Sequence, residues 1–422
     1  MATRSSHRLR TWRPRRVRSG VAAAVAVAAV AIIPVSPPAH AATSRGLTEP
    51  LSARSYRPCP TVKVPRPARS PAPSRDPSLP VVGGEALQTP GLAIPDGAPT
   101  PPAITATSWL VADLDTGAVL GACGAHERSA PASVQKLLLA ATMLPRLDPD
   151  QVVEVTDEDM DFEPGSSAMG LVRGGRYRIE TLWLGLMLNS GNDAANTLAR
   201  VGAGSIAEGV KAMNAEARRL GAFSTHAATP SGLDGPGQYT TAYDLALIAR
   251  ACFAREDFRR YATTRTARVP AQPHVGAKGF AMQNDNPLIT EYPGALGGKT
   301  GYTDLARHTY VGAAERNGRK LVVTLLGAEA QPLRGWEQGA KLLDWGFSLP
   351  REAAVGRLIT PEEAEELVNP KPTATVSPYP LQAETATDST ALALRNGIAI
   401  SVVAVLLLGL LSTTWWRARR NG

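Results

Sequence analysis

Residues 133–136 (SVQK) place a hydroxyl and an amine three positions apart, about one helical turn, in this chain of 422 residues. The apolar run 137–139 would withdraw Lys136 from water and lower its pKa, so that the neutral amine could accept the proton of Ser133. Arginine cannot act as such a base, although the chain has 37 arginines and only 8 lysines. The motif predicts a serine nucleophile with a lysine base. Taken alone, it also fits a capping serine beside a lysine whose stem packs on apolar residues.

A second motif, residues 190–192 (SGN), separates two stretches with helical periodicity. The hydroxyl of Ser190 could pass a proton to a leaving amine, and the amide of Asn192 could hold both Lys136 and a substrate carbonyl. Serine and asparagine are also common at helix breaks and caps. The chemical interpretation of this motif therefore depends on the presence of the other two.

The third motif is residues 299–301 (KTG), which follow Gly297 and Gly298. Glycines weaken an ordinary strand but let another backbone approach closely, as a bound peptide would. Lys299 and Thr300 together could hold a carboxylate. For this motif alone, a surface β-turn is the alternative.

The segment from about residue 105 to 350 carries the elements that must position these motifs. Two short strands around residues 115–117 predict a hairpin, and a helix is expected to begin near Ser133. A strand at 151–155 and helical patterns over 179–262 follow, and then come three strands joined by tight turns and a final helix. This order predicts an α+β fold, an antiparallel sheet flanked by helices with an all-helical insertion.

Both ends of the chain carry targeting signals. Residues 1–41 combine an arginine-rich start, an apolar stretch and a small-x-small pattern, which predicts a cleaved signal peptide. Residues 397–416 contain no charge and could span a membrane as a helix, and the basic tail 417–422 is expected to stay in the cytoplasm. Seven arginines near the start and three in the tail account for the formal net charge of +8 and leave −2 between them. The high pI is therefore no sign of nucleic-acid binding.

Two proline-rich stretches flank the central segment. Residues 42–104, with 11 prolines between positions 65 and 102, are expected to form an extended N-terminal segment. Residues 351–396, rich in Pro, Thr and Ala, are expected to form a stalk. The compact domain would then end at residue 350.

The three cysteines lie at positions 59, 123 and 252. Cys252 falls on an apolar helical face and is predicted to be a small core residue. In an oxidising compartment, Cys59 and Cys123 are the plausible disulfide pair, which would tie the N-terminal segment to the first hairpin. Neither the cysteines nor the 6 histidines have the spacing of a metal-binding motif.

The motifs Ser-x-x-Lys, Ser-x-Asn and Lys-Thr-Gly occur in that order, on a helix, a loop and a strand. Together they resemble those of the penicillin-binding protein and serine β-lactamase superfamily. The stretches SGNDAANTLA, TPSGLDGPGQYTTAYDLALIA and LGGKTGYT are similar to the low-molecular-mass D-alanyl-D-alanine carboxypeptidases. The resemblance covers about residues 105–350 and implies a β-lactamase/transpeptidase-like fold.

The resemblance implies a serine-type hydrolase that removes the terminal D-alanine from peptidoglycan stem pentapeptides and is acylated by penicillins. Ser133 would be the nucleophile, Lys136 its base and Ser190 the proton relay. The oxyanion would lie between the backbone N–H groups of Ser133 and Tyr302. The substrate would be bound by Asn192, Lys299, Thr300, Gly301 and Tyr302. No metal or organic cofactor is implied, and the expected partners are D-Ala-D-Ala peptides, β-lactams and the membrane, with no nucleic acid.

Two features depart from the family pattern. Arg307 stands where the family usually has glycine, and we expect a solvent-facing side chain there in preference to an extra contact with the substrate carboxylate. The β-rich second domain that many relatives carry is not expected here, since only the predicted stalk follows residue 350 before the predicted membrane helix. The catalytic domain is expected on the extracytoplasmic face of a bacterial cell membrane, with a single-pass anchor.

Three alternative functions share this set of motifs. A β-lactamase of the class with these motifs uses an E-x-x-x-N loop for deacylation, and none occurs between Asn192 and Lys299. A D,D-endopeptidase would cleave after the same kind of carbonyl, and the sequence does not distinguish it from a carboxypeptidase. A catalytically silent, penicillin-sensing or wall-binding receptor would keep the fold as a binding module.

Overall fold

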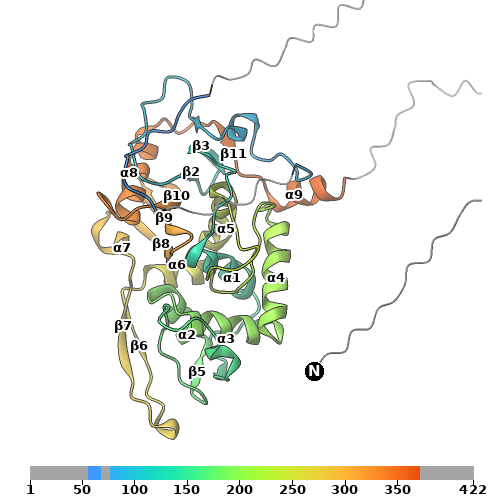
Figure 1. Ribbon diagram of the computed structural model, residues 1–422, viewed down its shortest axis with the longest axis vertical. Helices are drawn as coiled ribbons and strands as arrows, with labels where there is room; N and C mark the ends of the chain where they lie inside the picture. Colours follow the sequence, from blue (N-terminus) through green and yellow to red (C-terminus); the bar gives the residue numbers. More distant parts are fainter. Residues whose placement is uncertain (1–55, 68–76, 371–422) are drawn as a thin grey trace, which may run out of the picture. The chain divides into compact units, whose positions relative to one another are not determined.

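A central antiparallel sheet organises the computed structural model, which describes residues 56–67 and 77–370 (Figure 1). Its strand order is β1-β3-β2-β10-β9-β8, and β11 also pairs with β3. The strands are β1 Leu92–Ala93, β2 Ser108–Asp113, β3 Ala118–Cys123, β8 Ala295–Thr303, β9 Arg307–Arg316, β10 Arg319–Ala328 and β11 Gly356–Arg357. The predicted α+β class is confirmed.

Local turn chemistry explains the hairpins of this sheet. Between β9 and β10, Asn317 and Gly318 have φ of +50° and +70°, the left-handed conformation that a two-residue hairpin turn requires. Between β2 and β3, the carboxylate of Asp113 accepts hydrogen bonds from the N–H groups of Asp115 and Thr116, at 3.0 and 2.9 Å. Both hairpins were expected from the sequence.

The two faces of the sheet bury different side chains of β10. Leu321, Val323 and Leu325 belong to a core shared with α8 (Gly335–Ser348), whereas Val322 and Leu326 belong to a core shared with the helical part. This alternation follows from the two-residue period of a strand. The sheet is therefore a middle layer, and its edge strand β8 carries the third motif.

The helical part surrounds α1, all of whose residues are buried. Its helices are α1 Lys136–Met143, α2 Ile179–Leu188, α3 Asn192–Ala203, α4 Ile206–Arg219, α5 Ala242–Ala254 and α6 Glu256–Thr263. Leu137, Leu138 and Leu139 are 0% exposed, and each such burial contributes about 1.5–3 kcal/mol. Cys252 is buried on α5, as predicted, without a disulfide partner. Smaller elements are the pairs β4 Val152–Glu154 with β5 Arg176–Arg178 and β6 Thr266–Val269 with β7 Phe280–Gln283, and α7 Leu288–Glu291.

The N-terminal segment is not a free linker, which corrects the expectation for residues 77–104. The strand β1 pairs with β3, and Leu87 and Ile104 are buried in the core. The predicted Cys59–Cys123 disulfide is present and ties residues 56–67 to β3. These apolar side chains explain why a proline-rich stretch packs on the domain.

The boundary predicted at residue 350 is also wrong. Beyond it, β11 pairs with β3, and the helix α9 (Pro361–Val368) begins at Thr360, whose side chain accepts a hydrogen bond from the N–H of Glu363. Leu358 and Ala364 are 2% and 1% exposed in the same core as α5. The folded unit therefore continues to the end of α9. Its last elements are too short for their hydrophobic pattern to indicate that they bury apolar surface.

Several predicted segments lie outside the described residues: the signal peptide 1–41, most of the stalk, the membrane helix 397–416 and the tail 417–422. Within residues 56–67 and 77–370, no helix is long and apolar enough to cross a membrane. The same described residues contain no group of three or more His, Cys, Asp or Glu side chains that could hold a metal ion.

Candidate active site

Ser133 lies in a single 3-10 turn, Ala132–Gln135, that leads directly into α1. Ala132 has φ of +49°, a left-handed conformation that is costly for a residue with a side chain and concentrates at functional sites. The side chain of Thr309 on β9 donates a 2.8 Å hydrogen bond to the carbonyl of Pro131. A Cβ on Gly301 would lie 2.8 Å from the nitrogen of Ser133, so only glycine lets β8 approach the turn this closely.

The amine of Lys136 is 0% exposed and contacts three oxygen atoms. They are Oγ of Ser133 at 2.9 Å, Oδ1 of Asn192 at 2.7 Å and the carbonyl of Ser231 at 2.9 Å. Burial lowers the pKa of Lys136 well below its ordinary value, the charge of Lys299 lowers it further, and Asp193 partly opposes them. The serine and lysine of the first motif are thus in contact, in an environment that favours a neutral amine.

Asn192, the first residue of α3, is held on both sides of its side-chain amide. Its Oδ1 accepts from Lys136, and its Nδ2 donates to Oγ of Ser166 at 3.0 Å. Ser166 in turn donates to the carbonyl of Glu163 at 2.6 Å. These contacts fix which end of the amide faces Lys136.

Asp193 anchors the loop that brings Ser166 to the site. Its carboxylate accepts hydrogen bonds, each of 2.9 Å, from the backbone N–H groups of Met169, Gly170 and Leu171. The side chain of Asp193 is 0% exposed. These backbone donors satisfy the buried carboxylate and hold the loop against the start of α3.

Ser190 lies in the break between α2 and α3 with φ of +57°. The residue is 8% exposed, and no hydrogen-bond partner for its Oγ is found among the described residues. A left-handed serine with a buried, unpaired hydroxyl is an unfavourable arrangement that functional sites commonly retain. The hydroxyl is available to a bound substrate.

Lys299 is 2% exposed on β8, and its amine donates to the carbonyl of Thr300 at 2.8 Å. Burial lowers the pKa of Lys299 to about 8, while the charge of Asp285 acts in the opposite direction. Burial also raises the pKa of Asp285, and Lys299 opposes that shift. The site therefore contains two buried lysines, each with a carboxylate that acts on its pKa: Asp193 for Lys136 and Asp285 for Lys299.

The glycines before Lys299 have a different role from the one predicted. A Cβ on Gly297 would overlap the carbonyl of Ala262, and a Cβ on Gly298 would overlap the carbonyl of Val311. Their φ values are +93° and +156°, next to a bulge in the pairing with β9. The close backbone neighbours are therefore segments of this chain, which replaces the expectation that these glycines admit a bound peptide.

A cavity of about 510 Å³ joins these elements. The predicted site residues that line it are Ser133, Ser190, Asn192, Thr300, Gly301 and Tyr302. Lys136 and Lys299 are buried beside this cavity. The amine of Lys136 contacts the lining residue Ser133, and the amine of Lys299 contacts the lining residue Thr300. A hollow of about 810 Å³ beside β11 and α9 contains none of the motif residues. The 510 Å³ cavity is therefore the candidate active site.

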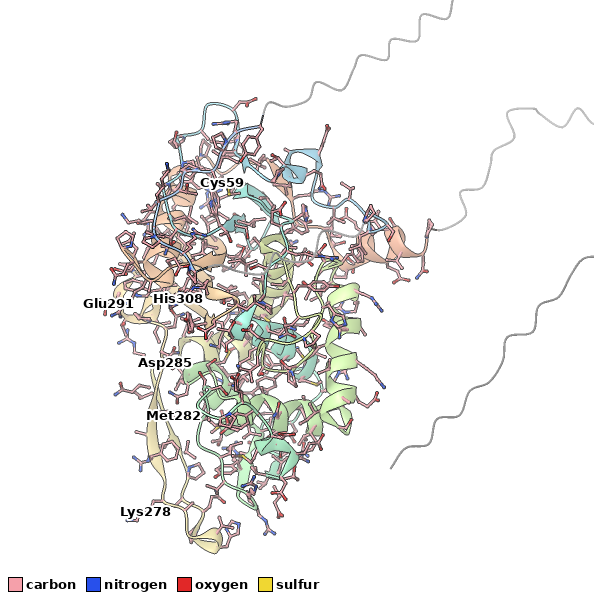
Figure 2. The ribbon with its side chains drawn as sticks, in the orientation of Figure 1. Cys59, Lys278, Met282, Asp285, Glu291 and His308 are labelled. Atoms are coloured by element: carbon pink, nitrogen blue, oxygen red, sulfur yellow. A yellow bond between two sulfur atoms is a disulfide. The ribbon has the colours of Figure 1, made fainter. Side chains whose placement is uncertain are left out.

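Several residues of the site were missed by sequence reasoning. Asp285 and His308, both labelled in Figure 2, line the cavity from the segment after β7 and from β9. Arg334, at the start of α8, also lines it. The others are Ser166, Asp193 and Ser231. Ser231 belongs to the stretch TPSGLDG, which resembled the family, but a contact made by its backbone carbonyl leaves no sign in residue type.

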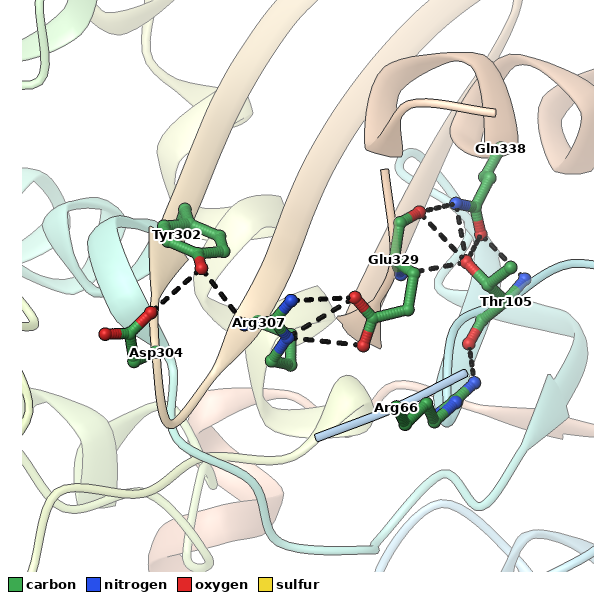
Figure 3. A network of polar contacts seen from close by, with 7 residues as sticks. All are labelled: Arg66, Thr105, Tyr302, Asp304, Arg307, Glu329 and Gln338. Carbon is green, nitrogen blue, oxygen red and sulfur yellow. Dashed lines mark hydrogen bonds and ion pairs between the residues drawn. The ribbon is translucent and has the colours of Figure 1, made fainter. Parts of the chain in front are cut away.

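Arg307 is not solvent-facing, which corrects the preferred expectation. Its side chain is 18% exposed and forms an ion pair with Glu329 at 3.0 Å, and it also donates to the hydroxyl of Tyr302 (Figure 3). Arg307 has φ of +58°. A left-handed backbone explains why glycine would suit this position, and the ion pair explains where the arginine side chain goes.

Comparison with known proteins gives one consistent result. A family model described as D-alanyl-D-alanine carboxypeptidase matches residues 96–330. The chain is 44% identical over 270 residues to the D-alanyl-D-alanine carboxypeptidase DacB2 of Mycobacterium tuberculosis, which covers 63% of this chain and 88% of that protein. It is 35% identical over 261 residues to DacD of Salmonella typhimurium, covering 59% of this chain and 64% of that protein.

Solved structures are similar over a comparable share of the chain. A crystal structure of a D-alanyl-D-alanine carboxypeptidase from Mycobacterium tuberculosis H37Rv aligns with a TM-score of 0.59 and 42% identity, covering 63% of this chain and 99% of that one. The Streptomyces K15 DD-transpeptidase aligns with a TM-score of 0.56 and 28% identity, covering 60% of this chain and 100% of that one. Residues 96–330, which the family model matches, include all three motifs.

Proposed function

The chain belongs to the D-alanyl-D-alanine carboxypeptidase family, and from this premise we propose that its cavity removes the terminal D-alanine from peptidoglycan stem pentapeptides through an acyl-enzyme on Ser133. The contact of 2.9 Å between Ser133 Oγ and the buried amine of Lys136 is the observation that carries the proposal. A neutral amine has two N–H donors and one lone pair. With the two donors on Asn192 and the carbonyl of Ser231, the lone pair is left for the hydroxyl of Ser133.

In the acylation step, Ser133 Oγ attacks the carbonyl carbon of the penultimate D-alanine while its proton moves to Lys136. The oxyanion lies between the backbone N–H groups of Ser133 and Tyr302, which are held in place before the charge develops. The C–N bond then breaks, and the leaving nitrogen takes a proton through Ser190, a residue that lines the cavity. Free D-alanine and an ester on Ser133 are the products.

In the second step, water attacks the ester, Lys136 again accepts a proton, and Ser133 is released with the shortened peptide. The same acylation chemistry opens the ring of a penicillin, so β-lactams are covalent inhibitors. All the groups required are side chains or backbone amides of this chain. The reaction divides one difficult amide hydrolysis into two easier steps.

The terminal carboxylate of the substrate binds, in this proposal, at the sheet side of the cavity. Lys299 is the buried cation there, and Thr300 offers a neighbouring hydroxyl. Arg334 also lines the cavity and adds a permanent positive charge. A terminal carboxylate is the feature that a carboxypeptidase must recognise, and this concentration of cations supports that preference.

The test is to incubate the purified protein with a pentapeptide ending in D-Ala-D-Ala and to measure free D-alanine. The Ser133→Ala variant should lose both D-alanine release and covalent labelling by a fluorescent penicillin. Labelling of the wild type without D-alanine release would favour the silent receptor. Rapid hydrolysis of penicillin would favour a β-lactamase, and cleavage of cross-linked dimers in preference to the pentapeptide would favour an endopeptidase.

The proposed location is the outer face of a bacterial cell membrane. Two features of the sequence support it: the signal peptide pattern of residues 1–41 and the uncharged stretch 397–416 followed by a basic tail. A disulfide between Cys59 and Cys123 is in keeping with an oxidising compartment. Cell fractionation of a protein truncated after residue 370 checks the anchor, since release into the medium is expected.

A further inference from the structure

Tyr302 forms part of the cavity wall, yet 48% of its surface is exposed. A half-exposed aromatic side chain would ordinarily change rotamer freely, and binding a ligand against it would cost conformational entropy. Three neighbours restrict it here. Its hydroxyl donates to Asp304 at 2.9 Å and accepts from Arg307 at 3.0 Å, and its ring centroid lies 4.7 Å from that of His308.

Arg307 is itself held by Glu329. The guanidinium donates through Nε and Nη2 to the two carboxylate oxygens, at 3.0 to 3.3 Å, which leaves Nη1 for Tyr302 (Figure 3). The side chains of Arg307 and Glu329 are only 18% and 10% exposed. A forked, largely buried ion pair of this kind has a defined geometry, unlike a surface pair.

The backbone of Glu329 is fixed in turn by buried polar groups. Its carbonyl accepts from the side chains of Thr105 and Gln338, at 3.1 and 2.9 Å, and its N–H donates to the hydroxyl of Thr105 at 2.9 Å. Thr105 and Gln338 are 1% and 0% exposed. Figure 3 shows this line of contacts, which runs from Gln338 and Thr105 through Glu329 and Arg307 to Tyr302.

The backbone at Arg307 does not need this side chain. With φ of +58°, the position would suit glycine better. The pairing of Tyr302 with His308 and of Thr303 with Arg307 holds the hairpin between β8 and β9 through backbone groups. The side chain of Arg307 must therefore position the residues that it binds, Glu329 and Tyr302. Of these two, Tyr302 lines the cavity.

We propose that Arg307 is a positioning residue for the substrate: held by Glu329, it fixes the Tyr302 side chain as a preformed wall of the cavity and thereby sets the affinity for the peptide. This inference rests on the proposed function, because it takes the cavity to be the peptide site. Arg307 contacts the hydroxyl of Tyr302 and not the backbone N–H that the proposed mechanism uses, and no contact joins it to Ser133 or Lys136 among the described residues. Its removal should therefore weaken binding and leave the chemical step unchanged.

The test measures peptide binding in a Ser133→Ala background, where no acylation occurs. Adding Arg307→Gly should raise the dissociation constant for the D-Ala-D-Ala pentapeptide about three- to tenfold, and Glu329→Gln should do the same. Arg307→Lys should give an intermediate value, since lysine keeps the charge but not the fork. In a Tyr302→Phe background, Arg307→Gly should have a smaller effect, because the hydroxyl it acts on is gone.

Asn317→Gly is the matched control, since it replaces another left-handed non-glycine residue of β9's hairpin outside the cavity. Its affinity should equal that of the Ser133→Ala parent, and thermal unfolding should show that all variants fold. An unchanged dissociation constant in Arg307→Gly, or an equal loss in Asn317→Gly, would overturn the inference. If the Ser133→Ala parent itself does not bind the peptide, the proposed function fails first.

Discussion

Two buried lysines lie at the active-site cavity, one in the helical part and one in the sheet. Lys136 is 0% exposed at the start of α1, and its amine contacts three oxygens from three separate segments. Lys299 is 2% exposed on β8, and the carbonyl of Thr300 is the one hydrogen-bond partner found for its amine among the described residues. Equal burial therefore does not mean an equal role.

The difference between the two lysines lies in their acceptors. Three oxygens surround the amine of Lys136, and the burial that lowers its pKa favours the neutral form that a base requires, with two N–H donors and one lone pair. The amine of Lys299 donates to the carbonyl of Thr300 and has further donors for an incoming carboxylate. In the proposed mechanism, Lys136 must lose a proton to act, whereas Lys299 must keep one.

The largest expected effect comes from exchanging each lysine for arginine. Lys136→Arg should lower kcat/KM for the pentapeptide about 10²–10⁴-fold, because a guanidinium cannot accept the proton of Ser133. Lys299→Arg should lower it about tenfold or less, because a permanent cation still binds a carboxylate. D-alanine release and the rate of penicillin labelling measure both.

A surface substitution, Lys211→Arg, is the control for the exchange of lysine for arginine alone, since within the described part of the chain Lys211 pairs with Glu208 on the same helix. It should leave kcat/KM unaltered. Similar losses in Lys136→Arg and Lys299→Arg would break the comparison, because they would mean that neither lysine acts through its neutral form.

The next effect is on the pH dependence of kcat/KM. Activity should rise with pH as Lys136 deprotonates, since its lowered pKa separates the inactive charged form from the active neutral one. It should fall as pH rises through about 8, because Lys299 then loses the charge that holds the carboxylate. The expected profile is a bell, measured on the free enzyme at low substrate concentration.

Lys299→Arg should abolish the falling limb of this profile, because arginine stays charged throughout the range. The rising limb should stay in place, since a cation remains near Lys136. A falling limb that persists in Lys299→Arg would assign it to another group and would remove the distinction between the two lysines.

A smaller effect is expected from Ser166→Ala, which acts on the Lys136 side only. Ser166 accepts a hydrogen bond from Asn192 and so keeps the oxygen of that amide on Lys136. Loss of one such bond should lower kcat/KM about three- to tenfold and leave the falling limb of the pH profile unchanged. Ser167→Ala, a neighbour that also lines the cavity, should have less effect, because its contact with Asn192 is made by its backbone carbonyl.

The sequence was informative wherever function depends on side-chain type at short spacing. Ser133 and Lys136 are one turn apart, so their contact follows from local geometry. The apolar stretch KLVVTLLGA likewise predicted one of the three consecutive strands, and it forms most of β10. The Arg307–Glu329 pair could not be predicted, because the two residues lie 22 positions apart. In addition, Arg307 has a left-handed backbone, at a position where the family usually has glycine.

The domain boundaries were harder to predict for a related reason. Residues 77–104 and 351–368 look like linkers because they have few regular elements, yet Leu87 and Leu358 are buried. Short strands such as β1 and β11 have too few residues to show a period. Composition describes the average hydrophobicity of a stretch, whereas packing depends on a few apolar side chains at particular positions.

The smallest effect on activity is expected from removing the disulfide. Neither Cys59 nor Cys123 lines the cavity, so replacing both with serine should change kcat/KM less than about twofold. The difference between Lys136→Arg and Lys299→Arg should be unchanged in that background, since additivity holds for distant sites.

The stability of the protein should fall when the disulfide is removed, because the bridge closes a loop with a sequence separation of 64, worth about 4 kcal/mol in the chain-entropy model. Thermal unfolding with and without a reducing agent measures this loss. If activity falls in parallel with stability at a temperature where the variant is folded, the N-terminal segment takes part in positioning the lysines, and their contrast is not a property of the cavity alone.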